Sequence, residues 1–263
     1  MDEPRYLHGH HESVLRSHRW RTAQNSAAYL LPHLTPGLDL LDIGCGPGTI
    51  TSELADLVAP GRVLGIDRSA EVIAAATADH PKIDFAVGDM YALDLADGLF
   101  DVVHAHQVLQ HVPDQVSALR ELRRILRPGG ILAARDSIYA SKAWSPDDLL
   151  LTRWNDLYHQ IARRDGGEPD AGRYLLDWVT EAGFVDATYS SSTWTYADAE
   201  SREWWGGLWA ERVRSSAFAD HGLEYGLTDR DELERIAEAW QRWAGHPTST
   251  FVVVHGEIIA RRQ

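Results

Sequence analysis

One short segment constrains the fold of this chain more than any other. It runs from Leu40 to Thr49 and reads LLDIGCGPGT, so an apolar run leads into three alternating glycines and then into a helical pattern. Glycine lets the backbone approach a ligand closely and adopt dihedral angles that other residues avoid. The N-terminus of the following helix offers unpaired backbone N–H groups. The segment predicts a strand, a ligand-cradling loop and a helix, although an ordinary tight turn between strand and helix has a similar composition.

Strand and helix patterns alternate through the first half of the chain. Apolar runs predict strands at 38–43, 62–66, 83–87, 100–105 and 131–134. Amphipathic runs predict helices at 49–58, 69–79 and 114–126, with Ser69 as an N-cap. This alternation is typical of a parallel sheet built from βαβ units with right-handed crossovers. The sequence therefore predicts an α/β fold.

The second half of the chain is richer in helical patterns. Helices are expected at 149–162 and 174–181, and strands at 185–195 and at 251–259, where Gly256 is expected to interrupt the strand. Thr228 and Asp231 have the spacing of a capping box before a further helix. We expect residues 1–37 to form a helical lead-in or lid. Residues 38–263 are expected to form a single domain with helical insertions at about 140–170 and 196–249.

Composition excludes several classes of function. The net charge of −14 argues against a nucleic-acid partner, because an acidic surface repels phosphate. Cys45 is the only cysteine, which excludes an intrachain disulfide and a cysteine-based zinc site. No stretch has the length and apolarity of a membrane span and the N-terminus is polar, so we expect no membrane partner and a cytoplasmic location. His8, His10 and His11 lack a carboxylate at a matching helical interval, so no bound metal is expected.

The spacing of the glycines distinguishes two classes of ligand. A dinucleotide loop has the pattern G-x-G-x-x-G, whereas this loop is G-x-G-x-G and has Thr49 at the sixth position. Asp67 ends the second predicted strand about 20 residues later, where a carboxylate can accept both hydroxyls of a ribose; its alternative role is a helix cap. Asp89 and Met90 follow the third predicted strand, where the carboxylate can accept from an adenine amino group and the thioether can lie on the ring.

The ordered set of motifs resembles the class I S-adenosylmethionine-dependent methyltransferases, and within them the UbiE-like, or methyltransferase domain 11, group. The resemblance covers roughly residues 36–136. It rests on IGCGPG at 43–48, GID at 65–67, GD at 88–89, FDVV at 100–103, VLQH at 108–111 and LRPGG at 126–130. It implies a Rossmann-like seven-stranded sheet with helices on both faces, an antiparallel last strand and a helical lid. It also implies S-adenosylmethionine as the cofactor and S-adenosylhomocysteine as the product.

The resemblance assigns a cofactor role to a defined set of residues. The expected cofactor-binding residues are Asp42, Gly44, Cys45, Gly46, Gly48, Asp67, Arg68, Gly88, Asp89, Met90, His106 and Gln107. Asp42 and the three loop glycines would surround the methionine part, Asp67 would hold the ribose, and Asp89 with Met90 would hold the adenine. Members that methylate quinones carry Arg-Asn after the fourth strand. The His-Gln pair in this sequence argues against a quinone precursor as the substrate.

Methyl transfer from a sulfonium requires alignment of donor and acceptor, and a general base where the acceptor is a hydroxyl or a protonated amine. The candidate catalytic residues are His106, His111 and Asp136, because they follow strands four and five at the edge where open α/β sheets bind ligands. His111 is also typical of a residue that bonds nearby backbone at a helix start.

Aromatic residues outside the glycine motif predict the acceptor pocket. The candidate substrate-binding residues are Tyr6, His10, Arg21, Tyr139, Trp205 and Trp209. Trp205, Trp209 and Arg212 share one helical face, which can line a pocket for a small planar or partly apolar acceptor, or can pack between helices.

Two alternative functions remain at this point, an NAD-type Rossmann oxidoreductase and a non-catalytic S-adenosylmethionine-binding regulatory protein. The sequence does not specify the acceptor, the O, N or C atom that is methylated, or the oligomeric state, and a homodimer is compatible with it.

Overall fold

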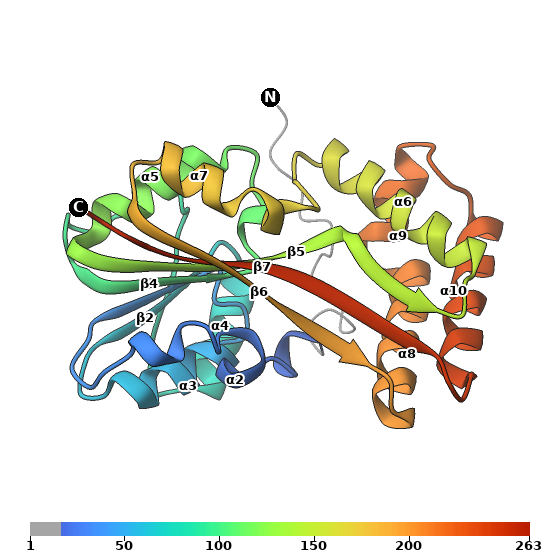
Figure 1. Ribbon diagram of the computed structural model, residues 1–263, viewed down its shortest axis with the longest axis horizontal. Helices are drawn as coiled ribbons and strands as arrows, with labels where there is room; N and C mark the ends of the chain where they lie inside the picture. Colours follow the sequence, from blue (N-terminus) through green and yellow to red (C-terminus); the bar gives the residue numbers. More distant parts are fainter. Residues whose placement is uncertain (1–16) are drawn as a thin grey trace.

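The computed structural model describes residues 17–263, and its centre is a seven-stranded sheet (Figure 1). The strands are β1 (Leu40–Ile43), β2 (Val63–Asp67), β3 (Asp84–Val87), β4 (Phe100–His106), β5 (Leu126–Ser145), β6 (Val185–Tyr196) and β7 (Thr250–Arg261). Their order is β3-β2-β1-β4-β5-β7-β6. The pairs from β3 to β5 are parallel, and β7 runs antiparallel to both β5 and β6. The α/β fold class and the antiparallel last strand are confirmed.

Helices cover both faces of the sheet. They are α2 (Ala23–Ser26), α3 (Thr49–Val58), α4 (Ala70–Asp79), α5 (Gln115–Ile125), α6 (Leu149–Arg164), α7 (Leu175–Glu181), α8 (Ala199–Ser215), α9 (Ala217–Glu224) and α10 (Arg230–Gly245). Short 3-10 helices are η1 (Leu31–His33), η2 (Leu109–His111) and η3 (Ala171–Arg173). Helices α2 and α3 pack with Leu40 and Val102 on one face, and α5 and α7 pack with Leu41 and Val103 on the other. Alternate residues of β1 and β4 therefore supply two separate cores.

The three strands at one side of the sheet are much longer than the others. In Figure 1, β5, β6 and β7 continue past the parallel strands toward a second group of helices, α6, α8, α9 and α10. These strand ends and helices share a third core that is rich in tryptophan, including Trp154, Trp209 and Trp240. The molecule therefore has two lobes joined by continuous strands.

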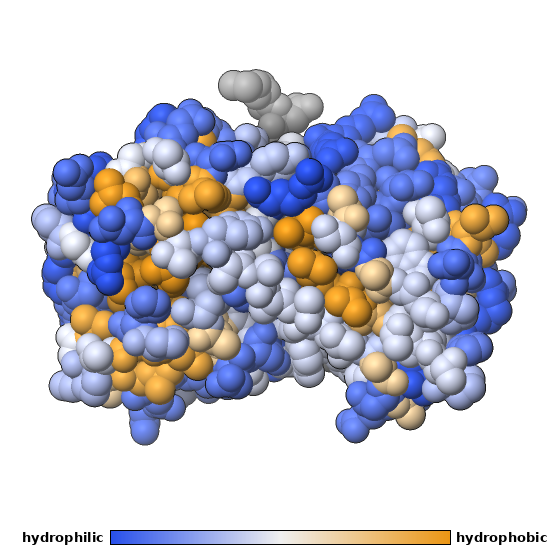
Figure 2. Space-filling view, viewed as in Figure 1, coloured by the Kyte–Doolittle hydropathy of each residue, from blue (hydrophilic) through white to orange (hydrophobic). Residues whose placement is uncertain are grey.

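Hydrophilic residues predominate over the right-hand lobe in Figure 2. On the left-hand lobe and along the junction, hydrophobic residues form groups that hydrophilic ones interrupt. Within residues 17–263, no helix is long and apolar enough to cross a membrane.

Three details of the sequence prediction are wrong. Strand β5 extends well past the predicted end at residue 134, because Arg135 pairs with Glu257 of β7 and so the polar run continues the strand. Gly256 does not interrupt β7; a Cβ at that position would lie 2.1 Å from the carbonyl oxygen of Gly172, so the glycine permits close packing of η3 on the sheet. The N-cap of α10 is Asp229, which accepts from the Glu232 backbone N–H, and Thr228 donates instead to the Glu232 carboxylate.

Candidate active site

The glycine loop connects β1 to α3 and depends on left-handed backbone geometry. Gly44, Gly46 and Gly48 have φ angles of 66°, 55° and 80°. A Cβ on Gly44 would lie 2.4 Å from a methyl group of Val108, and one on Gly48 would lie 2.7 Å from the ring of Phe85. The loop can therefore hold no larger residue at these two positions without a shift of its neighbours.

Asp67 lies beside this loop, at the carboxyl end of β2. Its Oδ2 accepts from the Gly46 N–H at 3.1 Å, and its Oδ1 accepts from the Ser69 N–H at 3.0 Å. The carboxylate is therefore oriented before any ligand binds, and the half-buried side chain retains further acceptor capacity. Ser69 caps α4, as predicted.

The predicted adenine contacts lie at the end of β3. Asp89 is exposed, and its carboxylate accepts from the Tyr91 N–H at 3.0 Å. Met90 is buried in the same hydrophobic cluster as Ile66. Gly88 packs on Ile66, because a Cβ would lie 2.9 Å from that side chain, whereas Arg68 is exposed beyond β2.

Asp42 and Cys45 both lie inside the protein. The Thr51 hydroxyl donates to Oδ2 of Asp42 at 2.5 Å, and Nδ1 of His104 lies 2.7 Å from Oδ1. This buried carboxylate therefore joins β1, α3 and β4. Burial raises the pKa of the Cys45 thiol, with Asp42 and Asp67 adding to the effect, so the thiol stays protonated.

Gln107 connects the glycine-loop end of the sheet to the second lobe. It follows β4 with a φ of 55°, and its side-chain oxygen accepts from Arg21 at 2.6 Å. Its side-chain nitrogen donates to the Ser137 hydroxyl at 3.1 Å. Non-glycine residues with positive φ are uncommon and are held by surrounding contacts.

The three candidate catalytic residues lie in different environments. His106 is buried on the sheet face that carries His104, and neither ring nitrogen bonds to another residue in the described part of the chain. Burial lowers the pKa of His106 well below its usual value, and Arg21 and Arg135 lower it further. Burial lowers the pKa of His111 on η2 to about 3. Both imidazoles are therefore neutral at neutral pH.

Asp136 lies on the opposite face of β5 from Ser137. Its Oδ1 accepts from the Gln110 N–H at 3.1 Å, and it is fully buried near η3. Burial raises the pKa of Asp136 to about 8, so it is protonated at neutral pH. The structure therefore does not place Asp136 with Gln107 and Ser137 on the pocket side of the sheet.

The raised pKa of Asp136 predicts a pH-dependent cost to stability. The folded protein keeps this proton to a higher pH than the unfolded chain. The contribution of Asp136 to the free energy of unfolding is therefore complete below about pH 4 and is lost as pH rises through about 8. Relative to Asp136→Asn, the wild type should lose up to about 1.4 kcal/mol of unfolding free energy per pH unit across this window. Urea unfolding of both proteins at several pH values measures the difference. A constant difference would show that Asp136 ionises normally.

A pocket lies between the second lobe and the end of β4. Its lining consists of Ser17, His18, Trp20, Arg21, Gln107, Ser137, Tyr139, Lys142, Trp194, Tyr196, Trp204, Trp205, Trp209, Arg212 and Val253. The lining side chains fill most of the space between them and leave a cavity of about 30 Å³. The pocket adjoins the glycine loop, because the Thr49 hydroxyl donates to the His18 carbonyl.

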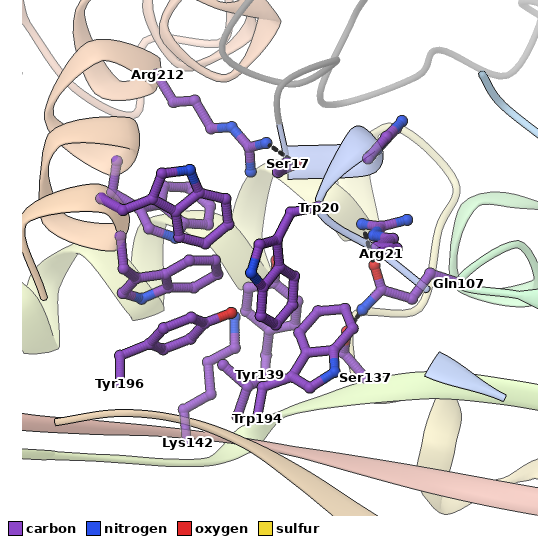
Figure 3. A pocket seen from close by; sticks show the side chains of 15 residues that line it. Ser17, Trp20, Arg21, Gln107, Ser137, Tyr139, Lys142, Trp194, Tyr196 and Arg212 are labelled. Atoms are coloured by element: carbon purple, nitrogen blue, oxygen red, sulfur yellow. Dashed lines mark hydrogen bonds between the residues drawn. The ribbon is translucent and has the colours of Figure 1, made fainter. Parts of the chain in front are cut away.

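Four of the predicted substrate residues line this pocket: Arg21, Tyr139, Trp205 and Trp209. Tyr6 and His10 lie outside the described residues. Figure 3 shows Trp20 across the opening, with Tyr196 and Lys142 below it. The ring of Trp205 stacks on Tyr196 at 4.3 Å, whereas Trp209 packs edge-on against Trp154 at 4.5 Å. Both α8 tryptophans thus line the pocket, and Trp209 also packs against α6.

The sequence prediction missed several pocket residues, including Lys142, Trp194 and Tyr196. Lys142 lies beyond the predicted end of strand β5, so it was not placed at a strand end. Trp194 and Tyr196 share one face of β6, and their alternation with exposed Thr195 was the available signal.

Comparisons with known proteins identify the family. Residues 41–134 match the family described as Methyltransferase domain. The whole chain is 33% identical to an uncharacterized methyltransferase of Schizosaccharomyces pombe and covers 98% of it. Over 97% of its length it is 30% identical to the probable methyltransferase ltbC of Aspergillus luteorubrus, and it covers 96% of that protein.

Solved structures show the same fold. The YcgJ protein of Bacillus subtilis has a TM-score of 0.59 at 17% identity, covering 91% of this chain and 99% of that one. Phosphoethanolamine N-methyltransferase 2 of Haemonchus contortus, solved with S-adenosylhomocysteine, has a TM-score of 0.56 at 16% identity over 91% of this chain and 52% of that one. The chain belongs to the class I S-adenosylmethionine-dependent methyltransferases. It is therefore a methyltransferase enzyme, and its cofactor is S-adenosylmethionine.

Proposed function

We propose that this enzyme transfers the methyl group to O, N or C of a small, planar, partly apolar metabolite bound in the aromatic pocket. The observation that carries the proposal is the position of that pocket. Gln107 lines it and directly follows β4. His18 also lines it, and its carbonyl accepts from the Thr49 hydroxyl just after the glycine loop. The acceptor would thus meet the cofactor at the carboxyl edge of the sheet, where α/β folds bind ligands.

The residues around the glycine loop fit the cofactor. Gly44, Gly46 and Gly48 leave room for its methionine part, Asp67 has acceptor capacity for ribose hydroxyls, and exposed Asp89 can accept from the adenine amino group. S-adenosylmethionine supplies an activated methyl group. The role of this chain's residues is to hold donor and acceptor in line and to exclude water.

The environments of Asp136 and His111 do not favour a role as general base. Asp136 is protonated and lies on the other face of β5, and the pKa of half-buried His111 on η2 is lowered to about 3. His106 is neutral and lies near Trp194, with ring centroids 5.8 Å apart, so it is the candidate that the proposal retains. We further propose a cytoplasmic enzyme with a small-molecule substrate, with a homodimer as the assembly to test.

The proposal is tested by incubating the purified protein with isotopically methyl-labelled S-adenosylmethionine and planar phenols, amines and carboxylic acids. Mass spectrometry of the products identifies both the acceptor and the methylated atom. Labelled product from a planar acceptor supports the proposal. Turnover only of large or wholly polar acceptors would contradict it, and binding of S-adenosylmethionine without any turnover would support a regulatory protein instead.

Trp20→Ala should reduce acceptor use while leaving cofactor binding unchanged. Trp20 contacts the rings of Trp194 and Trp204 at 5.3 Å across the pocket, and its side chain is 38% exposed, so little core packing is lost. Loss of aromatic contacts predicts about a three- to tenfold lower kcat/KM for the acceptor. Steady-state kinetics measure this change, with Trp178→Ala as a control tryptophan outside the pocket. Equal loss in both variants would argue against an acceptor role for Trp20.

A further inference from the structure

The described part of the pocket lining contains basic side chains. Its lining includes Arg21 from the segment before α2, Lys142 from β5 and Arg212 from α8, and none of the described lining residues is an aspartate or a glutamate. This contrasts with the whole chain, which has a net charge of −14. A local cluster of cations in an acidic protein favours an anionic ligand.

Lys142 is the most unusual of these residues. Its side chain rises from β5 into the space among the rings (Figure 3) and is only 9% exposed. Its Nζ lies over the ring of Tyr139, 2.9 Å from the centroid, and 5.1 Å from that of Trp154. It makes no hydrogen bond or ion pair with any residue from 17 to 263. Burial of such a group is costly unless an acceptor binds it.

The acidic side chain nearest in effect to Lys142 is that of Asp170, which already has other partners. Asp170 accepts from the Ala140 N–H at 2.7 Å and pairs with His159 at 3.2 Å. No carboxylate of the described chain therefore pairs with Lys142, which leaves its amine available to an acceptor on a ligand.

Two further donors belong to the lining. The hydroxyl of Tyr196 and the Nε1 of Trp205 are buried and have no hydrogen-bond partner within the described residues. Figure 3 shows the Tyr196 hydroxyl directed toward the centre of the pocket, on the side of Lys142. Arg212, which is buried and donates to the Ser17 hydroxyl at 2.6 Å, adds positive charge to the lining. The site thus offers hydrogen-bond donors and cations to an acceptor oxygen.

We propose that the acceptor pocket binds a planar aromatic oxyanion, an aromatic carboxylate or an ionised phenol, whose negative oxygen is held by Lys142 and Tyr196. The inference rests on the proposed function, in which this pocket holds the methyl acceptor. The flat surfaces of Trp20, Trp194 and Trp205 suit an aromatic ring, and the positive cluster disfavours an amine in its ammonium form.

Binding of such an anion should change the protonation of Lys142. Burial lowers the pKa of Lys142 well below its usual value, with Arg212 lowering it further and Asp170 opposing the shift. The other titratable groups around the amine are Tyr139 of β5, Tyr158 of α6, Tyr196 of β6 and His255 of β7. A negative oxygen beside the amine favours the ammonium form, so binding should take up a proton.

The test uses the purified full-length chain with saturating S-adenosylhomocysteine. Calorimetry measures the affinity of trans-cinnamate, 4-nitrophenolate, the neutral cinnamamide and cinnamylamine. The two anions should bind at least about tenfold more tightly than the amide, and the amine should bind most weakly. Repeating the cinnamate titration in buffers of different ionisation enthalpy should reveal proton uptake.

Lys142→Met keeps a side chain of similar length and should abolish both the anion preference and the proton uptake. Its affinity for S-adenosylhomocysteine should match that of the wild type. Tyr196→Phe gives a second variant with a weaker loss of the preference. Arg164→Gln is the control, because Arg164 lies over the ring of Tyr225, outside the pocket.

Equal affinity for cinnamate and cinnamamide, failure of both anions to bind at millimolar concentration, or an unchanged preference in Lys142→Met would overturn the inference. Methylation of a neutral planar acceptor alongside any of these results would leave the proposed function intact. Failure of the wild type to bind S-adenosylhomocysteine would instead contradict the assignment of the cofactor site.

Discussion

Replacement of Asp67 with alanine should weaken S-adenosylmethionine binding by about 100-fold or more, because hydrogen bonds to a charged group contribute about 1.5–3 kcal/mol each. The side chain is positioned at the end of β2 by the Gly46 and Ser69 N–H groups, so little entropy is lost when it accepts ribose hydroxyls. Calorimetric titration of wild type and variant with S-adenosylmethionine measures the change.

Two further variants separate ligand contact from loop support. Asp67→Asn keeps an acceptor oxygen and should bind with intermediate affinity. Asp79→Ala removes an exposed carboxylate from the end of α4 and should bind like the wild type. Unchanged affinity in Asp67→Ala would show that Asp67 is not the ribose ligand. If Asp67→Ala lowered the melting temperature enough to explain the whole loss of affinity, that loss would be assigned to the missing Gly46 contact alone.

The glycine loop and its neighbouring strands could be predicted because their signals are local. Helix α3 begins at Thr49 and ends at Val58, as predicted, since the glycines precede it and Pro60-Gly61 follows it. The carboxyl end of β2 could be placed on the same grounds, and Asp67 lies there beside the loop. These elements are specified by residues that adjoin them in the sequence.

The extent of β5 and the continuity of β7 could not be predicted in the same way. Both depend on contacts between segments that are distant in the sequence, as in the contacts of Arg135 with Glu257 and of Gly256 with Gly172 of η3. In the local sequence, a polar run or a glycine indicates the end or interruption of a strand. Only the partner strand shows that Arg135 is neutralised and that Gly256 is needed for close packing.

The sequence predicted part of the pocket, including Arg21 and Tyr139, and its clearest signal lay on one helix. The spacing of Trp205, Trp209 and Arg212 on α8 indicated a shared face, and all three line the pocket. Lys142 joins them through the register of β5 with β7, which pairs Ala143 with Val252 after a shift in register. Such a shift leaves no sequence pattern, so the residue that carries the further inference emerged only from the three-dimensional arrangement.

Trp154→Ala should destabilise the protein by about 3–5 kcal/mol, the range expected for removal of a fully buried tryptophan. Its ring packs edge-on against Trp209 at 4.5 Å and Trp240 at 4.9 Å, in the core shared by the helices of the second lobe. Its Nε1 donates to no described residue, so the loss comes from packing and the cavity left behind.

Calorimetric melting of Trp154→Ala should therefore show a fall of about 10 °C for a chain of this size. Trp178 is half-buried on α7 in the other lobe, and the Trp178→Ala variant should melt much closer to the wild type. Because β5 and β7 pass from the cofactor lobe into the core around Trp154, the two lobes should unfold together, and S-adenosylhomocysteine should raise the melting temperature of the variant. Two separate transitions, with the cofactor stabilising only one, would show instead that the lobes are energetically independent despite their shared strands.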